Sequence, residues 1–367
     1  MARTYRVAVV GRTGKGEYGH GLDVVWKALD NVEIVAVADE DDKGRAAAAA
    51  RLGARSAYAD YRDMLDKERP QIVSVADRWL DQHRDVVVAC ARAGANVLLE
   101  KPMARTLVEA DDMTTACETH HVKLAIAHQT RYSPRLKRVR ELIDAGRLGD
   151  LLELRGRGKE DSRGGGEDLM VLGTHVFDLM RFLAGDARWC FARVLQKGKP
   201  ATKADVSEGG EGMGPVLGDQ IMALYGFDGG VRGTFDTEKA KDGAGRRFGL
   251  TVYGSKGLVQ LTTGSLPAAC FLDDPSWFPG KSKAEWQDIT SAGLGKPEPL
   301  KDDGLASGNV WIAKDLIDAI EQDRQPLGGM YDGRAALEMI LAAYESHRFD
   351  RPVDLPLENR KHPLAVW

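Results

Sequence analysis

The first third of the chain constrains the fold most, because short apolar runs alternate there with helix-forming segments. Continuous apolar runs suit strands that are buried on both faces of a sheet. Strands that alternate with helices build a parallel sheet with right-handed crossovers. We therefore expect a doubly wound α/β domain over residues 1–127. The expected strands cover 7–10, 32–38, 72–76, 97–99 and 123–127, and the expected helices cover 22–29, 43–52, 81–93 and 107–119.

The pattern changes after residue 127, where strands follow one another without intervening helices. The run 151–156 alternates in hydropathy, as a half-buried strand does. An antiparallel or mixed sheet with helices on one side is expected, so residues 128–367 should form an α+β domain. The expected strands are 151–156, 189–196, 219–227, 230–237, 247–254 and 257–262, and the expected helices are 135–145, 171–183, 309–322 and 333–347.

Composition and charge argue against several kinds of partner. The net charge of −4 gives no basic excess for binding nucleic acid by counterion release. No window approaches the roughly eighteen apolar residues of a membrane span, and the first residues lack the apolar region of a secretion signal. The widely spaced cysteines favour buried free thiols and a cytoplasmic location. They are Cys90, Cys117, Cys190 and Cys270. His120 and His121 point apart on a helix, so we expect no metal site.

A glycine-rich loop after the first strand, followed by an acid at the tip of the second, is the arrangement that binds dinucleotides. Glycines let the backbone approach a pyrophosphate at a helix N-terminus. Asp39 can accept hydrogen bonds from both ribose hydroxyls and would repel a 2′-phosphate, so we expect NAD rather than NADP. The GxGxxG run begins at Gly14 instead of Gly11, so the loop is lengthened, and a mobile surface loop is the alternative. The expected cofactor-binding residues are Gly11, Thr13, Gly14, Gly16, Asp39, Ala76, Asp77, Glu100 and Lys101.

Two later motifs carry a resemblance to a known family. Glu100-Lys101-Pro102 follows a buried strand, and Gly173-Thr-His175-Val-Phe-Asp178 is followed by Leu-Ala-Gly. These motifs resemble those of the glucose–fructose oxidoreductase/inositol dehydrogenase (Gfo/Idh/MocA) family, and the order of elements is similar over nearly the whole chain. The resemblance implies an N-terminal Rossmann domain and a C-terminal α+β domain with a large, mostly antiparallel open sheet, which often forms the oligomer interface. It also implies NAD(P)-dependent chemistry on sugars, cyclitols and their relatives, and a proline at 102 that is often cis.

Lys101 and His175 are the expected centre of the reaction. A lysine at the carboxyl end of a parallel strand can point its ammonium into the ligand crevice and stabilise a developing alkoxide. His175 titrates near neutrality and can exchange the hydroxyl proton. The alternatives are a surface lysine and a locally hydrogen-bonded histidine.

One position departs from the family pattern. The family commonly has an acid four residues before the histidine, and this chain has Val171 there. Asp168 and Asp178 are the candidates to replace it, and the glycines at 164–166 favour a loop around Asp168. Asp178 is the expected third catalytic residue, although helix packing would explain it equally well.

Polar residues of the second domain are expected to contact the substrate. Arg131 and Tyr132 lie at a position that approaches the substrate in the family. The polar run 159–163 suits sugar hydroxyls and a solvated hairpin tip equally well. The expected substrate-binding residues are Arg131, Tyr132, Lys159, Arg163, Asp168 and His175.

Together these features predict an NAD(P)-dependent oxidoreductase that acts on a secondary alcohol or ketone of a sugar, sugar derivative or cyclitol. One alternative is an NAD-dependent sugar lyase or glycosidase that uses transient oxidation. Another is a catalytically weakened member that only binds the nucleotide. We expect a homodimer or homotetramer with a small-molecule substrate and with neither nucleic acid nor membrane as a partner.

Overall fold

The computed structural model describes residues 4–245 and 247–367. Residues 1–3 lie outside this range. The expected first domain begins with them, and so does the segment in which a secretion signal was not expected. The chain divides into two compact units. The first contains Met1–Gln129, Gly210–Met213 and Leu305–Arg334, and the second contains Thr130–Gly209, Gly214–Gly304 and Ala335–Trp367. Among the described residues, no helix has both the length and the apolar character that a membrane crossing requires.

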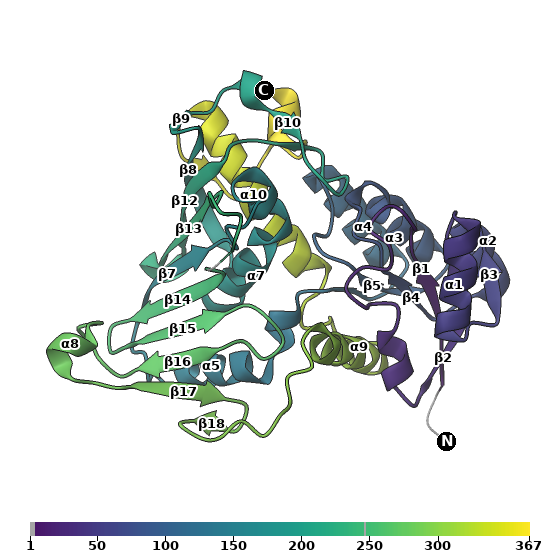
Figure 1. The fold of residues 1–367 in the computed structure, drawn as a ribbon, viewed down its shortest axis with the longest axis horizontal. Coiled ribbons are helices and arrows are strands. Elements are labelled where there is room, and N and C mark those ends of the chain that lie inside the picture. The colour runs from purple at the N-terminus through teal and green to yellow at the C-terminus, as the bar shows by residue number, and fades with distance from the viewer. Residues whose placement is uncertain (1–3, 246) are drawn as a thin grey trace. The chain divides into compact units, whose positions relative to one another are not determined.

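The first unit is built on a six-stranded parallel sheet in the order β3-β2-β1-β4-β5-β6 (Figure 1). Its strands are β1 (Tyr5–Val10), β2 (Val32–Ala38), β3 (Ser56–Tyr58), β4 (Ile72–Val75), β5 (Asn96–Leu99) and β6 (Leu124–Ile126). The strand order reverses direction between β1 and β4, and ligands of open α/β sheets bind at such a point. The doubly wound parallel sheet expected from the sequence is therefore confirmed.

Local sequence signals explain the helices of this unit. These are α1 (Asp42–Leu52), α2 (Tyr61–Glu68), α3 (His83–Arg92), α4 (Leu107–Thr119) and α9 (Leu305–Glu321). Asp41 and Thr106 cap α1 and α4 by accepting hydrogen bonds from backbone N–H groups of the first turn. Gly53 ends α1 in the left-handed conformation. Although α9 comes late in the sequence, it packs against β5 and β6.

The helix expected over residues 22–29 does not form. Only a short 3₁₀ helix, η1 (Val25–Ala28), is present, and turns occupy the residues before it. Gly19 and Gly21 have φ values of 60° and 86°, which a right-handed helix cannot accommodate. Gly19 also lies directly against the backbone oxygen of Ala76, where any side chain would collide. The structure therefore lacks the helix N-terminus that we expected to face the pyrophosphate.

The second unit is built on an eleven-stranded sheet in the order β18-β17-β16-β15-β14-β7-β13-β12-β8-β19, with β9 paired to β8. The central strands are β7 (Leu151–Arg157), β8 (Ala187–Gln196), β12 (Gln220–Phe227), β13 (Arg232–Glu238), β14 (Gly249–Gly254) and β15 (Leu258–Thr262). The outer strands are β9 (Lys199–Pro200), β16 (Ala269–Leu272), β17 (Trp286–Thr290), β18 (Gly293–Leu294) and β19 (Val353–Asp354). β7 and β13 are parallel, and the other neighbouring pairs are antiparallel. The large, mostly antiparallel sheet is confirmed.

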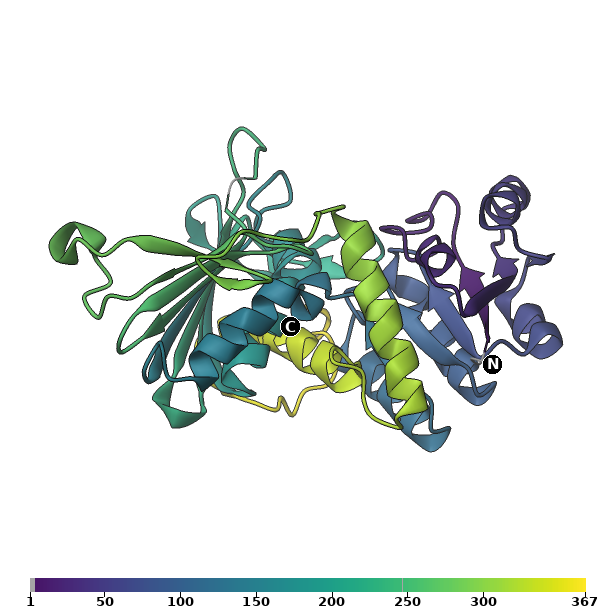
Figure 2. The same ribbon diagram turned by 90° about the horizontal axis from the view of Figure 1, so that it is seen from below.

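Helices cover one face of this sheet and leave the other face open (Figure 2). The helices are α5 (Pro134–Asp144), α6 (Gly166–Val171), α7 (Gly173–Ala184) and α10 (Met330–Phe349), most of which belongs to this unit, with the short α8 (Pro279–Ser282) beyond the strands. Strand β7 shows the alternation that this layering requires, because Leu154 is buried while Arg155 is exposed. A separate two-stranded ribbon pairs β10 (Ser207–Glu208) with β11 (Pro215–Val216). The four cysteines are free, and three of them are buried.

Candidate active site

Asp39, at the carboxyl end of β2, is the residue expected to bind the adenosine ribose. Its side chain is held by the glycine-rich loop. The backbone N–H of Thr13 donates to it at 3.1 and 3.3 Å, and the hydroxyl groups of Thr13 and Tyr18 donate to Oδ2 at 2.7 and 2.9 Å. The N–H of Asp41 donates to Oδ1 at 3.0 Å. Asp39 is consequently only 3% exposed.

The glycine-rich loop forms a small hairpin above the first strand. Arg12 and Glu17 pair as an antiparallel bridge, with Gly14 and Gly16 at positive φ in the turn between them. Nothing lies within 4 Å of the place where a side chain at Gly14 would project, and the N–H of Gly14 donates to the carboxylate of Glu17 at 2.9 Å. Gly16, in contrast, packs against the backbone of Arg78.

Asp77 lies beyond the carboxyl end of β4 and is 1% exposed. Among the described residues, no hydrogen-bond donor reaches either of its carboxylate oxygens. The nearest cation is Arg12, whose Nη1 lies 3.7 Å from Asp77 and 2.6 Å from Asp81. Burial raises the pKa of Asp77 to about 6, although His83 and Arg12 act in the opposite direction. A buried carboxylate without donors is unusual and marks a place where a ligand could supply them.

Glu100 and Lys101 follow β5, and both are buried. The Nδ1 atom of His20 lies 2.6 Å from Oε1 of Glu100, and the N–H of Lys101 donates to Oε2 at 2.8 Å. Burial alone would raise the pKa of Glu100, but His20 and then Lys101 lower it below its usual value. The peptide bond between Lys101 and Pro102 is cis, as the family resemblance implies.

His83, in the first turn of α3, holds the ends of two strands together. Its Nε2 lies 3.0 Å from the carbonyl of Asp77, and its Nδ1 lies 3.2 Å from the carbonyl of Pro102. The imidazole is fully buried, so it positions the segments that carry Asp77 and Lys101. Sequence reasoning missed the roles of Tyr18, His20 and His83, because each depends on a partner that is distant in the sequence.

These residues of the first unit fit a dinucleotide. Asp39, Asp77 and Lys101 follow three strands, β2, β4 and β5, whose carboxyl ends lie along one edge of the sheet. Asp39 would hold ribose hydroxyls, the turn at Gly14 would face phosphate once its N–H leaves Glu17, and the carboxylate oxygens of Asp77, which no described donor reaches, would accept hydrogen bonds. The missing helix after the lengthened loop departs from the usual arrangement.

In the second unit, His175 lies in the first turn of α7 and is half-buried. Its ring makes an edge contact with Phe248, with centroids 6.1 Å apart. Val171, at the position of the family's usual acid, is 3% exposed.

Asp178 and Arg131 form a buried ion pair. Nε of Arg131 donates to both carboxylate oxygens of Asp178 at 2.8 and 3.0 Å, and Nη2 donates to the backbone carbonyl of Asp178 at 3.0 Å. Arg131 is 5% exposed and Asp178 is 1% exposed, and the guanidinium also stacks on Phe182. This geometry favours a structural role for the pair, with Arg131 tying η3 (Gln129–Tyr132) to α7. Tyr132, which follows it, is buried as well.

Asp168 is fully buried and organises the polar run 159–163. It accepts hydrogen bonds from the N–H groups of Lys159 and Glu160, each at 3.1 Å, and from the hydroxyl of Thr237. The loop expected around Asp168 is wrong, because α6 begins at Gly166 and carries Asp168 in its first turn. Residues 164–166 are glycines because other backbone segments pack so closely against them that a side chain would collide.

Three polar residues of this run, Lys159, Asp161 and Arg163, pair with one another. Arg163 donates to Asp161 at 2.6 and 3.1 Å, and Nζ of Lys159 lies 3.4 Å from the same carboxylate. Arg163, through hydrogen bonds and charge, holds the pKa of Asp161 well below its usual range. Lys159 and Arg163 are both partly exposed, so this segment is an ordered polar loop.

The fold and these residues define a two-part dinucleotide-binding oxidoreductase, and comparison with known proteins places it more closely. Residues 5–128 match the model of an oxidoreductase family with an NAD-binding Rossmann fold, and residues 136–260 match the GFO/IDH/MocA C-terminal domain. The chain belongs to the Gfo/Idh/MocA family. The family, the NAD coenzyme and the oxidoreductase class expected from the sequence are confirmed.

Several relatives are dehydrogenases of sugars and cyclitols. Levoglucosan dehydrogenase of Pseudarthrobacter phenanthrenivorans is 27% identical over 248 residues, which span 61% of this chain and 63% of that protein. D-apiose dehydrogenase of Paraburkholderia graminis is 25% identical and matches 93% of this chain and 88% of its own length. Myo-inositol 2-dehydrogenase of Thermotoga maritima is 23% identical, with 68% and 74% covered. A levoglucosan dehydrogenase structure with NADH and L-sorbose has a TM-score of 0.78 at 19% identity, covers 97% of this chain and 100% of its own, and so shares the fold.

Proposed function

We propose that this protein transfers hydride between NAD and a secondary alcohol or ketone of a sugar, sugar derivative or cyclitol. The observation that carries the proposal is the buried Glu100-Lys101-Pro102 turn at the carboxyl end of β5. The dehydrogenases that match most of this chain act on a sugar or a cyclitol by name, D-apiose and myo-inositol, which supports the substrate class.

In this proposal Lys101 and His175 divide the work on the substrate hydroxyl. NAD, when bound, accepts the hydride. The ammonium of Lys101 donates a hydrogen bond to the reacting oxygen and stabilises negative charge as the O–H proton leaves. The imidazole of His175 takes that proton as a general base. The side chain of Glu100, paired with His20, keeps a fixed negative charge beside Lys101.

The other assignments are proposals of the same kind. NAD binds along residues 11–16, with Asp39 on the adenosine ribose and Ala76, Asp77 and Glu100 along the adjoining strand ends. Asp39 favours NAD over NADP because its carboxylate would repel a 2′-phosphate. The division into a coenzyme domain, 1–127, and a substrate domain, 128–367, goes with this assignment, although Gly210–Met213 and Leu305–Arg334 of the second range belong to the first compact unit. A substrate site that uses Lys159 and Arg163 goes with it as well. A cytoplasmic location is supported by the four free thiols.

Lys101→Ala tests the centre of the proposal. A screen of sugars, sugar acids and cyclitols for NADH absorbance identifies a substrate for the wild type. With that substrate the variant should lose roughly 10²–10³-fold in kcat, the size expected for a lost charge stabiliser, while NADH still binds. Lys123→Ala, which removes a lysine of the same unit that pairs with Asp323, is the matched control. Undiminished turnover in Lys101→Ala, or glycosidic cleavage without net NADH, would contradict the proposal.

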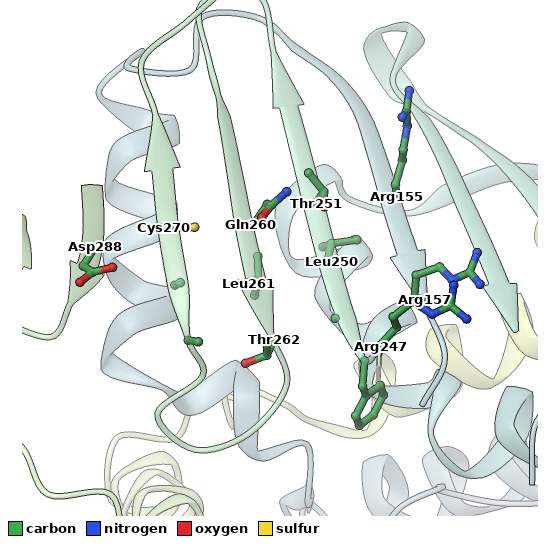
Figure 3. Close-up of a pocket in the computed structure, with 14 residues that line it drawn as sticks. Arg155, Arg157, Arg247, Leu250, Thr251, Gln260, Leu261, Thr262, Cys270 and Asp288 are labelled. Carbon is green, nitrogen blue, oxygen red and sulfur yellow. The ribbon is translucent and has the colours of Figure 1, made fainter. Parts of the chain in front are cut away.

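We also propose that the protein is a homodimer or homotetramer that associates through the open face of the large sheet. Exposed Met222 and half-buried Phe191 and Leu224 lie there on adjacent strands. Around them lie charges of both signs, such as Arg155 beside Glu153. Figure 3 shows a depression on this face, about 440 Å³ in volume, lined by Arg155, Arg157, Thr251, Gln260 and their neighbours. Mixed charges and apolar side chains on one face can pair with their own copy about a two-fold axis.

A further inference from the structure

We propose that Thr13 and Tyr18 form a latch over Asp39 that must open before the adenosine ribose of NAD can bind. The inference rests on the proposed role of Asp39 in binding that ribose. It makes Thr13 and Tyr18 determinants of coenzyme affinity, in addition to Asp39, the acid proposed to select NAD.

The carboxylate of Asp39 has no capacity left for a ribose. A carboxylate offers about four acceptor positions. Four donors already use them, namely the N–H and hydroxyl of Thr13, the hydroxyl of Tyr18 and the N–H of Asp41. With 3% of the residue exposed, the two ribose hydroxyls cannot reach these oxygens unless donors leave.

The sequence makes room for the latch at two glycines. A side chain at Gly44, in the first turn of α1, would collide with the hydroxyl of Thr13, and one at Gly11 would collide with the ring of Tyr18. A glycine inside a helix costs about 1 kcal/mol relative to alanine, so its presence at 44 needs a compensating contact. Packing of Thr13 onto this position supplies that contact.

The latch is held on its outer side as well. The guanidinium of Arg51, in the last turn of α1, lies 5.1 Å from the centroid of the Tyr18 ring and pairs with Asp23. Burial, followed by the hydrogen bond to Asp39, raises the pKa of Tyr18 well above its usual value. The phenol therefore stays protonated and remains a donor at any pH in the working range of the protein.

The two hydroxyl groups are the donors that a ribose can replace. Both are side-chain groups that can turn away by rotation, whereas the N–H groups of Thr13 and Asp41 belong to the backbone. Coenzyme binding would thus exchange the Thr13 and Tyr18 hydroxyls for the 2′ and 3′ hydroxyls of the ribose. Because hydrogen bonds to a charged group are lost in this exchange, the latch weakens binding and slows association.

The test removes each hydroxyl without changing the size of the side chain. Thr13→Val and Tyr18→Phe should each lower the Kd for NADH roughly tenfold, as expected for about 1.4 kcal/mol of competing hydrogen bonding. NADH fluorescence titration measures the Kd, and stopped-flow mixing should show faster association. Tyr58→Phe, which removes a 2.7 Å hydrogen bond to Glu68 in the same unit, is the matched control and should leave the Kd unchanged.

A Kd that is unchanged or higher in both variants would overturn the latch. Asp39→Ala separates this failure from failure of the ribose site itself, because an unchanged Kd in Asp39→Ala would place the ribose elsewhere. Gly44→Ala supplies an independent variant, since its methyl group should displace Thr13 and lower the Kd. Adding Thr13→Ala to Gly44→Ala should then cause no further decrease, whereas additive effects would also contradict the latch. Thermal unfolding of each variant establishes that it is folded.

Discussion

At the scale of single residues, the candidate coenzyme site keeps charged groups in unusual surroundings. Asp39 is oversupplied with donors, while Asp77, at the end of the next strand but one, has none among the described residues. Such contrasts are typical of functional sites, where local stability is given up for chemistry or binding. Replacing Asp77 is therefore expected to change the stability of the protein.

Asp77→Asn should stabilise the protein at neutral pH. The folded-state pKa of about 6 lies above the ordinary value of about 3.9. The folded chain thus binds this proton more tightly than the unfolded chain, and the resulting stability, fully present below pH ~4, is lost as pH rises through about 6. Two pKa units correspond to ~3 kcal/mol, so Asn should raise the free energy of unfolding by roughly 2–3 kcal/mol at pH 7 and by little at pH 4.

Urea unfolding at several pH values, without NAD, measures this difference. Asp81→Asn is the control, because Asp81 is partly exposed and already pairs with Arg12 at 2.6 Å, so its loss should bring no gain. A gain for Asp77→Asn that does not depend on pH would show that ionisation of Asp77 is not its cause.

At the scale of elements, sequence patterns predicted the helices and strands that are determined by local signals such as caps and apolar runs. The helix over 107–119 was placed at its observed bounds, since Thr106 caps it and apolar residues line one side. The strand over 32–38 was equally clear from its apolar run, which only Glu33 interrupts. The helix over 22–29 failed because Gly19 and Gly21 before it hold positive φ angles, and the position of Gly19 depends on packing against Ala76 and Glu100, which are distant in the sequence. Likewise, α6 could not be foreseen, since a run of glycines normally signals a loop and here satisfies close backbone contacts.

The link between η3 and α7 gives the element-scale prediction. Asp178→Asn should cost about 3–5 kcal/mol, because it leaves Arg131 as a buried charge without its counter-ion. The double variant Arg131→Met/Asp178→Leu replaces the pair with apolar side chains of similar size and should recover most of that stability. Chemical unfolding measures both effects.

Turnover distinguishes a structural from a catalytic role for Asp178. If the pair only joins the two elements, the stable double variant should recover kcat together with stability. A double variant that is as stable as the wild type but inactive would instead restore Asp178 to the reaction centre, as a partner of His175 in place of the acid missing at Val171.

At the scale of the whole molecule, the open face of the large sheet is the feature that most needs a partner. A sheet of eleven strands with helices on one face leaves its other face in water unless a second copy covers it. Stable dimers bury about 800 Å² per partner, which is the area that this face would contribute. Met222, in the middle of β12, is 41% exposed and lies opposite Arg193 and Asp236 on the adjacent strands.

Met222→Arg should therefore break the assembly without unfolding the chain. Light scattering after size-exclusion chromatography should give the wild type a multiple of 40.0 kDa, and should give the variant a mass reduced toward that of one chain. The introduced side chain would bring a long charged group into the contact between two copies, and removing its guanidinium from water is costly even beside Asp236. Leu300→Arg, at a residue that is 42% exposed in a loop away from this face, is the matched control and should keep the wild-type mass. A wild type of single-chain mass, or a Met222→Arg variant that assembles normally, would show that this face is not the interface, and the depression lined by Arg155 and Arg157 would then face solvent.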